Sequence, residues 1–246
     1  AVALGNFSWD WAYAAYDGAG DVAAAVADAY RTTALALRLP MQGGFASFPH
    51  VEDVPFIARR SRRSAADTRA VLGLSPGDRV VLTSFGGHGV VEMDLDALGA
   101  LEGYVVLVSG SIPFGLDGAA LLDQGRRGRL VPFDERALYA QGIRYEDLVA
   151  AADVVVTKPG FGIIAECVAN DTAMVYTSRG HFVEYDVMVR EMPDVLRCAF
   201  LPQADFFAGR WRAALDAVLA QPAPPTRPRV DGAEVVAARL DGLLGD

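Results

Sequence analysis

Two glycine-rich segments of the sequence have the composition of loops that bind phosphate groups. Each follows an apolar run, the first at residues 84–89 (Ser-Phe-Gly-Gly-His-Gly) and the second at residues 157–162 (Thr-Lys-Pro-Gly-Phe-Gly). Glycine lets the backbone approach an anion closely and point several N–H groups at it. A helix predicted to begin near residue 160 would add its first free N–H groups. The candidate phosphate-binding residues are therefore Gly86, Gly87, His88, Gly89, Lys158, Pro159, Gly160, Phe161 and Gly162.

Simpler interpretations exist for each of these residues. Glycines at a strand exit also serve tight turns that need a positive φ, and His88 is equally suited to a solvated turn. Lys158, the single lysine among 22 basic residues, is either a point charge for a phosphate or an exposed loop cation. Glu166, about two turns into the predicted helix, either faces a ribose diol or is a solvated helix position.

Alternating apolar strands and amphipathic helices predict the elements that position these loops. Apolar runs without polar alternation occur at 79–85, 104–109, 129–133, 153–157, 173–177 and 199–201, with predicted helices between most of them. Such runs are typical of parallel strands that are buried on both faces. We therefore expect an α/β fold with a parallel Rossmann-type sheet and helices on both faces. In such a sheet ligands bind beyond the carboxyl ends of the strands.

The flanking segments follow weaker patterns. An aromatic-rich loop is predicted at 5–11 and an alanine-rich helix at 21–30. A short strand is predicted at 33–37 that stops before Pro40. The segment 41–63 has no sustained period and reads as a connector whose four close arginines are solvated. A Ser-x-x-Asp start predicts a capped helix from Ser64, and one long helix is predicted at 205–219.

Composition limits the function classes. The chain has 246 residues, of which 52% are hydrophobic, and a formal net charge of −9. The hydrophobic share excludes a disordered chain, and the acidic balance argues against a nucleic-acid partner. No membrane span or signal peptide is visible, and Cys167 and Cys198 read as buried free thiols, so we expect a cytoplasmic protein.

Neither a metal nor a cofactor is expected. The three histidines are scattered without zinc-ligand spacing. Asp94-Leu95-Asp96 has the form of an Asp-x-Asp metal motif, but it falls at a predicted helix start, where acidic residues complement the helix dipole.

The order of strand, glycine loop, helix and acid resembles the C-terminal half of GT-B glycosyltransferases. It is similar to the lipid-linked N-acetylglucosaminyltransferases of cell-wall synthesis. It is more closely similar to predicted glycosyltransferases and to the glycosyltransferase-like N-terminal region of plant arabinokinases. The matching stretches span most of the chain: 6–10, 38–40, 53–55, 85–87, 147–153 and 158–166.

This resemblance implies a domain organisation for the chain. Residues 58–220 would form the nucleotide-sugar-binding Rossmann-like domain. Residues 1–57 would be the remnant of a second Rossmann-like domain, for the acceptor, plus a linker. Residues 221–246 would form a proline-rich linker and a terminal helix that packs back toward the first domain. We expect that the rest of the acceptor domain, including the general base, lies outside this chain, which alone could be an inactive fragment.

The resemblance also implies residue roles. The two glycine loops and Lys158 would contact the diphosphate, Glu166 the ribose, and the backbone near Phe133 the base. His181, Glu184 and Tyr185 would contact the sugar, although this segment lacks the glutamine pair of the cell-wall enzymes. Asn6, Trp9 and Asp10 would border the interdomain cleft.

The expected function is metal-independent transfer of a hexosyl or N-acetylglucosaminyl group from a nucleotide sugar, taken as a UDP-sugar, to an acceptor that the sequence does not specify. Two alternatives stay open. One is a non-catalytic nucleotide-sugar-binding module of a sugar-metabolism protein. The other is a nucleotide-sugar epimerase on the same fold, for which Glu184 and Asp186 are the candidate acids in this chain.

Overall fold

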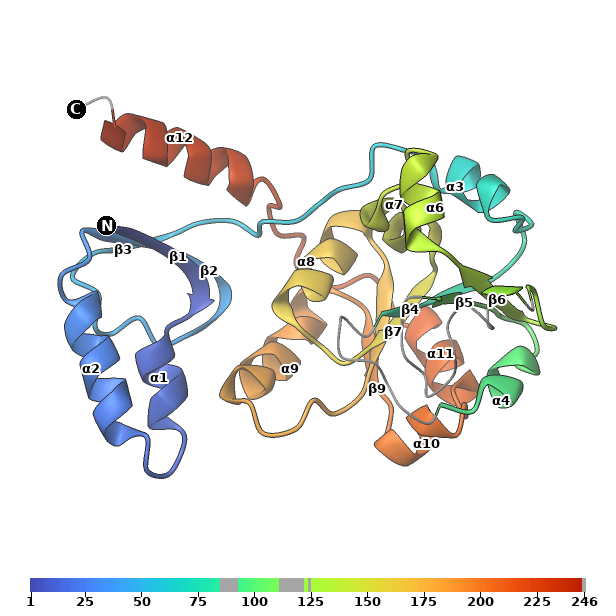
Figure 1. The fold of residues 1–246 in the computed structure, drawn as a ribbon, viewed down its shortest axis with the longest axis horizontal. Coiled ribbons are helices and arrows are strands. Elements are labelled where there is room, and N and C mark those ends of the chain that lie inside the picture. The colour runs from blue at the N-terminus through green and yellow to red at the C-terminus, as the bar shows by residue number, and fades with distance from the viewer. Residues whose placement is uncertain (85–92, 111–121, 124, 245–246) are drawn as a thin grey trace.

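A computed structural model shows two parallel β-sheets joined by extended chain segments (Figure 1). The structure describes residues 1–84, 93–110, 122–123 and 125–244. The smaller sheet has the order β1 (Val2–Phe7), β2 (Leu35–Gly43) and β3 (Val51–Asp53). The larger sheet has the order β6 (Leu130–Phe133), β5 (Val105–Ser109), β4 (Val80–Ser84), β7 (Val154–Thr157), β8 (Ala173–Tyr176) and β9 (Cys198–Phe200). The predicted parallel α/β architecture is thus confirmed.

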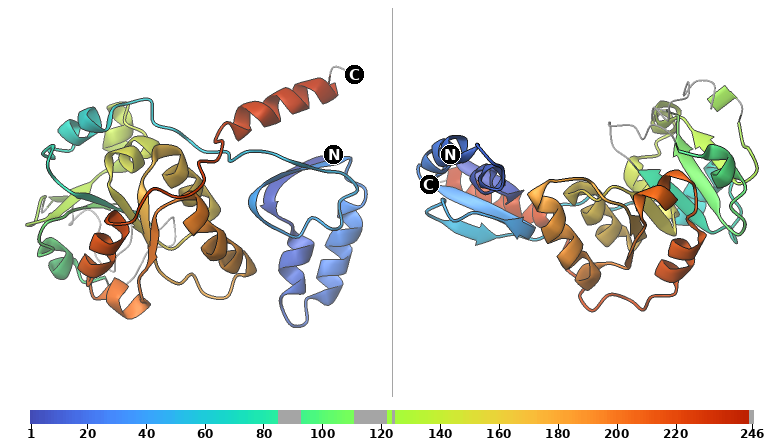
Figure 2. Two further views of the ribbon diagram at one scale, coloured as in Figure 1. Left: turned by 180° about the vertical axis from the view of Figure 1, so that it is seen from behind. Right: turned by 90° about the horizontal axis from the view of Figure 1, so that it is seen from below.

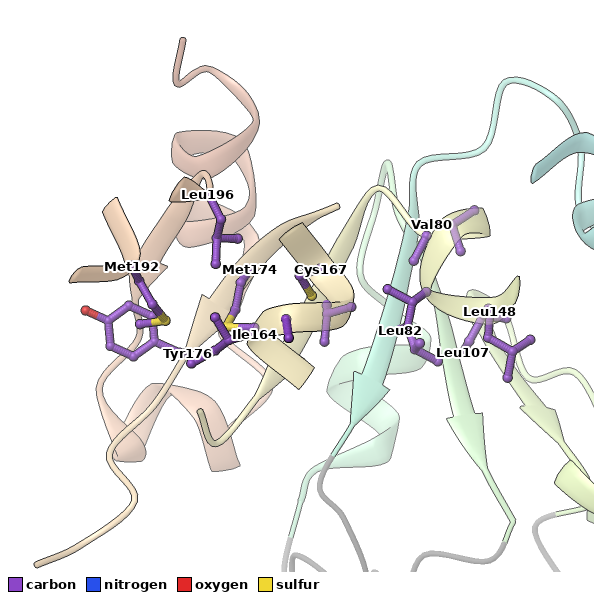
Figure 3. Close-up of a cluster of buried hydrophobic side chains, with 14 of the residues drawn as sticks. Val80, Leu82, Leu107, Leu148, Ile164, Cys167, Met174, Tyr176, Met192 and Leu196 are labelled. Carbon is purple, nitrogen blue, oxygen red and sulfur yellow. The ribbon is translucent and has the colours of Figure 1, made fainter. Parts of the chain in front are cut away.

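Both faces of the larger sheet are covered, which explains its uninterrupted apolar strands. In β4, Val80 and Leu82 belong to one buried cluster and Val81 to the other. The first cluster lies under α6 (Glu135–Ala140), α7 (Tyr145–Ala151), α8 (Phe161–Asn170) and α9 (Val183–Val195). Figure 3 shows part of this cluster, from Val80 and Leu148 to Met192 and Leu196. The second lies under α4 (Leu95–Gly99), α10 (Gln203–Phe207) and α11 (Arg212–Leu219).

The strand order of the larger sheet creates a switch point between β4 and β7. From β4 the chain first adds β5 and β6 on one side and then adds β7, β8 and β9 on the other. Ser84 and Thr157, the last residues of the two central strands, are paired in register. The Thr157 hydroxyl donates a hydrogen bond to the Ser84 carbonyl oxygen. Ligands of open α/β sheets bind in the crevice at such a point, and both glycine-rich segments begin there.

The smaller sheet is covered by α2 (Gly20–Tyr30) on one face and by α12 (Gly232–Leu244) on the other, while α1 (Trp9–Ala14) packs beside α2. Leu35, Leu37 and Leu39 of β2 pack with Val236 of α12. Arg239 of α12 also forms a two-pronged ion pair with Glu52 of β3, with N–O distances of 2.8 and 2.9 Å. Figure 2 shows α12 beside this sheet in both views. The C-terminal helix therefore returns to the N-terminal segment of the chain.

Three sequence-based predictions of local structure are wrong. β2 runs through Pro40 to Gly43, because its pairing with β3 has ended at Arg38 and its pairing with β1 skips from Arg38 to Gly43. The missing proline N–H therefore costs no ladder bond. The aromatic segment at 5–11 is not a loop but the end of β1 and the start of α1. The helix predicted at 205–219 is two helices, separated by a turn in which Gly209 has a φ of 65°.

The predicted N-cap of α3 (Ala65–Val71) is confirmed, since the Ser64 hydroxyl oxygen accepts a hydrogen bond of 3.0 Å from the Asp67 N–H. We expect Ser64→Ala to lower the free energy of unfolding by about 1 kcal/mol, because an orphan N–H loses its partner. Ser64→Gly should cost only a few tenths of a kcal/mol. Urea unfolding of the three proteins checks this, and an alanine variant as stable as the wild type would contradict the capping role.

Candidate functional site

The start of α8 presents free N–H groups at the switch point. Gly160 is the N-cap with extended backbone (φ −148°, ψ 152°), and its carbonyl oxygen accepts the first helical bond, from Ile164. The N–H groups of residues 161–163 precede that bond and have no acceptor within the helix. The segment 86–89, the other half of the predicted diphosphate site, lies outside the described residues.

The geometry of Gly162 is that of a glycine that the fold itself does not require. Its φ is not positive, and a Cβ built on it would meet no atom within 4 Å. The tight-turn interpretation therefore does not explain this residue. Gly160 is different: its φ is also ordinary, but a Cβ there would lie 3.3 Å from Nη1 of Arg179. A side chain at residue 162 would therefore point into open space.

Hydroxyl groups collect at the ends of the central strands. The Tyr145 hydroxyl donates to the Ser84 hydroxyl oxygen at 2.5 Å, and burial raises the pKa of Tyr145 well above its usual range. Thr177, directly after β8, is fully buried, and its side-chain oxygen has no hydrogen-bond partner among the described residues. This edge of the sheet is thus polar beneath the first turn of α8.

Glu166 is a buried carboxylate. It is 6% exposed, and its Oε1 accepts from Nε of Arg59 at 2.5 Å and also faces Nη2 of Arg59. Burial raises the pKa of Glu166, and the hydrogen bond and charge of Arg59 oppose that shift. Glu166 is therefore not a solvated helix position. Arg59 is exposed, as expected for the connector, but it also pairs with this buried carboxylate. The described residues provide no partner for Oε2 of Glu166, and contact with a ribose stays a prediction.

The four arginines of the connector, Arg59 among them, line a cavity. Its volume is about 960 Å³, and its basic lining residues are Arg59, Arg60, Arg62, Arg63 and Arg144. The acidic lining residues are equal in number: Asp67, Glu146, Asp147, Asp231 and Glu234. The cavity therefore has no net excess of either formal charge.

Lys158 and Phe133 lie where the sequence places them, at strand ends. Lys158 directly follows β7 and is half-buried, and its ammonium group makes no ion pair with any described residue. Phe133 ends β6, and its carbonyl oxygen accepts the Gly110 N–H at 2.9 Å. Phe133 is separated from β4 by β5, so a base bound there would lie two strands away from β4, the nearer strand of the switch point.

The predicted sugar and cleft residues meet where β1 and α1 contact the start of α9. The Asn6 side-chain amide donates to Oε1 of Glu184 at 2.7 Å, and both residues are buried. The Trp9 ring lies 6.5 Å from the Phe182 ring, between centroids. His181 is exposed and lines a cavity of about 450 Å³ together with Tyr16 and Asp186. Tyr185 is half-buried, and burial raises its pKa.

Asp10, also predicted at the cleft, is held by hydroxyl groups. Its Oδ2 accepts from the Ser47 hydroxyl at 2.5 Å, whereas its buried Oδ1 has no partner among the described residues. Burial raises the pKa of Asp10, but hydrogen bonds led by those of Ser47 and Ser8 outweigh it and lower the pKa overall. Asp10 is therefore an ionised carboxylate at neutral pH.

The predicted metal motif has structural partners. The Asp94 side chain caps α4 by accepting from the Ala97 N–H at 2.9 Å, and Asp96 pairs with Arg127 at 2.8 Å. Both carboxylates therefore have the helix-start roles expected from their position.

Comparisons with known proteins identify the fold. No family model matches the chain. The structure of CalG4, the calicheamicin glycosyltransferase, superimposes with a TM-score of 0.56 at 17% identity, over 94% of this chain and 60% of that one. MurG from Acinetobacter baumannii superimposes with a TM-score of 0.51 at 15% identity, over 92% of this chain and 70% of that one. The chain has the GT-B fold of glycosyltransferases.

A curated relative matches by sequence. L-arabinokinase from Arabidopsis thaliana is 26% identical over 221 residues, which cover 87% of this chain. The chain spans 20% of the length of that protein and 60% of CalG4. No helix within the described residues of this GT-B chain has the length and apolar character needed to span a membrane.

The sequence does not predict the contacts of two charged residues beside the candidate site. It places Arg59 among the solvated arginines of the connector and gives no role to Arg179. Arg179 follows β8, and its Nη1 donates to the Pro159 carbonyl oxygen at 3.2 Å and lies 3.6 Å from Oε2 of Glu184. The contacts of Arg59 with Glu166 and of Arg179 with Pro159 join residues 107 and 20 positions apart, so local spacing in the sequence does not predict them. The one available signal was the position of Arg179 at the end of a predicted parallel strand.

Proposed function

We propose that this protein is a glycosyltransferase that binds a UDP-sugar at the switch point, with the diphosphate at the first turn of α8. The observation that carries the proposal is the exposed, unconstrained Gly162 beside three free N–H groups. Anions bind at such helix ends because the N–H groups and the helix dipole both favour negative charge. The fold neighbours, which are glycosyltransferases, support the same reaction class.

The reaction assigned to this site is a displacement at the anomeric carbon of the donor. The acceptor hydroxyl oxygen forms a bond to that carbon, and the carbon–oxygen bond to the diphosphate breaks. The bonding electron pair stays on the diphosphate, and the hydroxyl proton passes to a base on the acceptor side. Preorganised N–H groups and Lys158 stabilise the charge that develops on the leaving group, in the place of a metal ion.

The remaining roles follow the position of each residue around this diphosphate. Glu166, on the second turn of α8, is proposed to meet the ribose through Oε2, with Arg59 holding Oε1. The end of β6 at Phe133 is proposed to meet the base. His181 and Tyr185 are proposed to meet the sugar or the acceptor from the start of α9.

The test of this proposal is a binding and turnover series on the purified protein. Isothermal titration calorimetry with UDP, ADP and GDP should show UDP binding, and UDP should raise the melting temperature. Sugar release from UDP-glucose and from UDP-N-acetylglucosamine is then monitored through the UDP that forms, and the faster reaction identifies the donor. Absence of any nucleotide diphosphate binding at millimolar concentration would contradict the proposal.

A second candidate, a nucleotide-sugar-binding module without transferase activity, is favoured by the contact between Asn6 and Glu184. Glu184, expected to meet the sugar, is 5% exposed, and its Oε1 is taken by Asn6. A protein that binds UDP-sugars but neither hydrolyses nor transfers them would support this candidate over the first. Steady UDP formation from a UDP-sugar would reject it.

A further inference from the structure

The Arg179 side chain lies beside the N-terminus of α8. Its Nη1 is 3.2 Å from the Pro159 carbonyl oxygen and 3.3 Å from the position that a Cβ on Gly160 would take. The guanidinium group therefore sits within one residue of the free N–H groups of residues 161–163. The N-terminus of a helix carries partial positive charge, which repels a cation.

The charges around this point do not balance within the described residues. Lys158 and Arg179 contribute two positive charges, and the free helix end adds to them. Glu184 is the carboxylate that contacts Arg179, with Oε2 at 3.6 Å from Nη1. Within the described residues Arg179 shares one carboxylate and Lys158 has none, so a bound diphosphate would supply negative charge to both cations and to the helix end.

The donor capacity of Arg179 is largely unused. A guanidinium group has five N–H donors in a fork that matches phosphate oxygens. Within the described part of the chain its hydrogen bonds and ion pair involve Nη1, which leaves Nε and Nη2 for another partner. The side chain is 41% exposed and lies over the Phe182 ring, with 5.8 Å from Cζ to the centroid. The fork is therefore held in place but open to solvent.

Glu184 and Asn6 hold the Arg179 side chain in this position. Glu184 contacts Arg179 with Oε2 and accepts from Asn6 with Oε1. Asn6 of β1 therefore helps to hold Arg179, which follows β8 of the larger sheet. Gly160 leaves room for the guanidinium group, because a Cβ there would lie 3.3 Å from Nη1 of Arg179 and the side chain would have to shift slightly.

We propose that Arg179 is a phosphate-binding residue that clamps the donor diphosphate against the first turn of α8, and that Glu184 and Asn6 are its positioning residues. This inference rests on the proposed nucleotide-sugar site, and it assigns a group to that site which neither the sequence nor the comparisons indicate. It also gives Glu184 a role other than sugar contact.

The test compares ligands with and without phosphates on the same variants. UDP and uridine binding are measured by calorimetry on the wild type, Arg179→Gln and Arg179→Lys. Loss of one charged hydrogen-bonding partner should weaken UDP binding about tenfold in Arg179→Gln, while uridine binding stays unchanged. Arg179→Lys keeps the charge and should recover part of the loss. Arg190→Ala, an exposed arginine on α9 that pairs with Glu191, is the matched control and should change neither affinity.

The possible outcomes separate this inference from the proposed function. If the wild type binds no UDP, the proposed function fails and Arg179 has no diphosphate to bind. Suppose that the wild type binds UDP but that Arg179→Gln leaves UDP affinity unchanged, or weakens UDP and uridine binding equally. The proposed role of Arg179 is then wrong, whereas the proposed UDP-binding site is retained. Equal uridine affinity in wild type and variant also shows that the variant is folded.

Discussion

Phe161→Pro is expected to bind UDP about 10- to 100-fold more weakly than Phe161→Ala, because proline removes one N–H that we assign to the diphosphate. Residue 161 is the first residue of α8, where proline is well tolerated. The extended backbone of Gly160 suits the residue before a proline. The N–H of residue 161 makes no helical bond, so its removal leaves the helix intact.

The alanine variant is the matched control for this comparison. Both substitutions remove the Phe161 ring, which stacks on Phe56 at 5.6 Å between centroids, so the loss of packing is common to both. The difference in UDP affinity, measured by calorimetry, therefore reports on the N–H group alone. Equal affinities in the two variants would show that this amide does not contact the ligand.

Arg59→Ala should destabilise the fold by about 1–3 kcal/mol at neutral pH, because it leaves the buried Glu166 carboxylate without its charged partner. The half-exposed position of Arg59 keeps the effect below that of a fully buried ion pair. Arg60→Ala, which changes an exposed neighbour, should alter stability by less than about 0.5 kcal/mol. Urea unfolding of the two variants and the wild type gives these differences.

The effect of Arg59→Ala should depend on pH in a defined direction. Burial raises the pKa of Glu166 above its ordinary value of 4.5, and Arg59 restrains the rise. Removal of Arg59 therefore raises the pKa of Glu166 further. A folded-state pKa above the unfolded value contributes stability that is present below 4.5 and is lost as pH rises through the folded-state pKa. As pH rises through this range, Arg59→Ala therefore loses more folding stability than the wild type does.

The gap in stability between wild type and Arg59→Ala is thus smallest near pH 4 and largest near pH 7. Glu166→Gln supplies the control, since a neutral amide at this position removes the titration. In that background, Arg59→Ala should cost less at pH 7 and show little change in cost with pH. If, with the native Glu166 present, the stability difference between wild type and Arg59→Ala stays constant from pH 4 to pH 7, the pairing of Arg59 with Glu166 is contradicted.

Most of the larger sheet was predictable from the sequence, because its strands are buried on both faces and read as continuous apolar runs. The strands predicted from 79 to 201 all appear within one or two residues of their predicted limits. Errors occurred where tertiary structure overrides a local signal. Pro40 reads as a strand breaker, yet β2 passes it because no neighbour needs that N–H.

The site was predictable only where it is local. Lys158, Gly160, Gly162 and Glu166 belong to one strand–loop–helix unit, and their spacing predicts their position. The contacts of Arg59 with Glu166 and of Asn6 with Glu184 join residues 107 and 178 positions apart, so the three-dimensional packing alone brings them together. The same is true of Arg179, whose contact with Pro159 crosses from β8 to β7.

The central claim is that a nucleotide diphosphate binds at the first turn of α8. A crystal structure of the protein with UDP tests it most directly. The account predicts diphosphate oxygens at hydrogen-bonding distance, about 2.7–3.2 Å, from the N–H groups of residues 161–163. UDP bound elsewhere, for example in the arginine-lined cavity at residues 58–64, with the start of α8 left in contact with solvent alone, would contradict it.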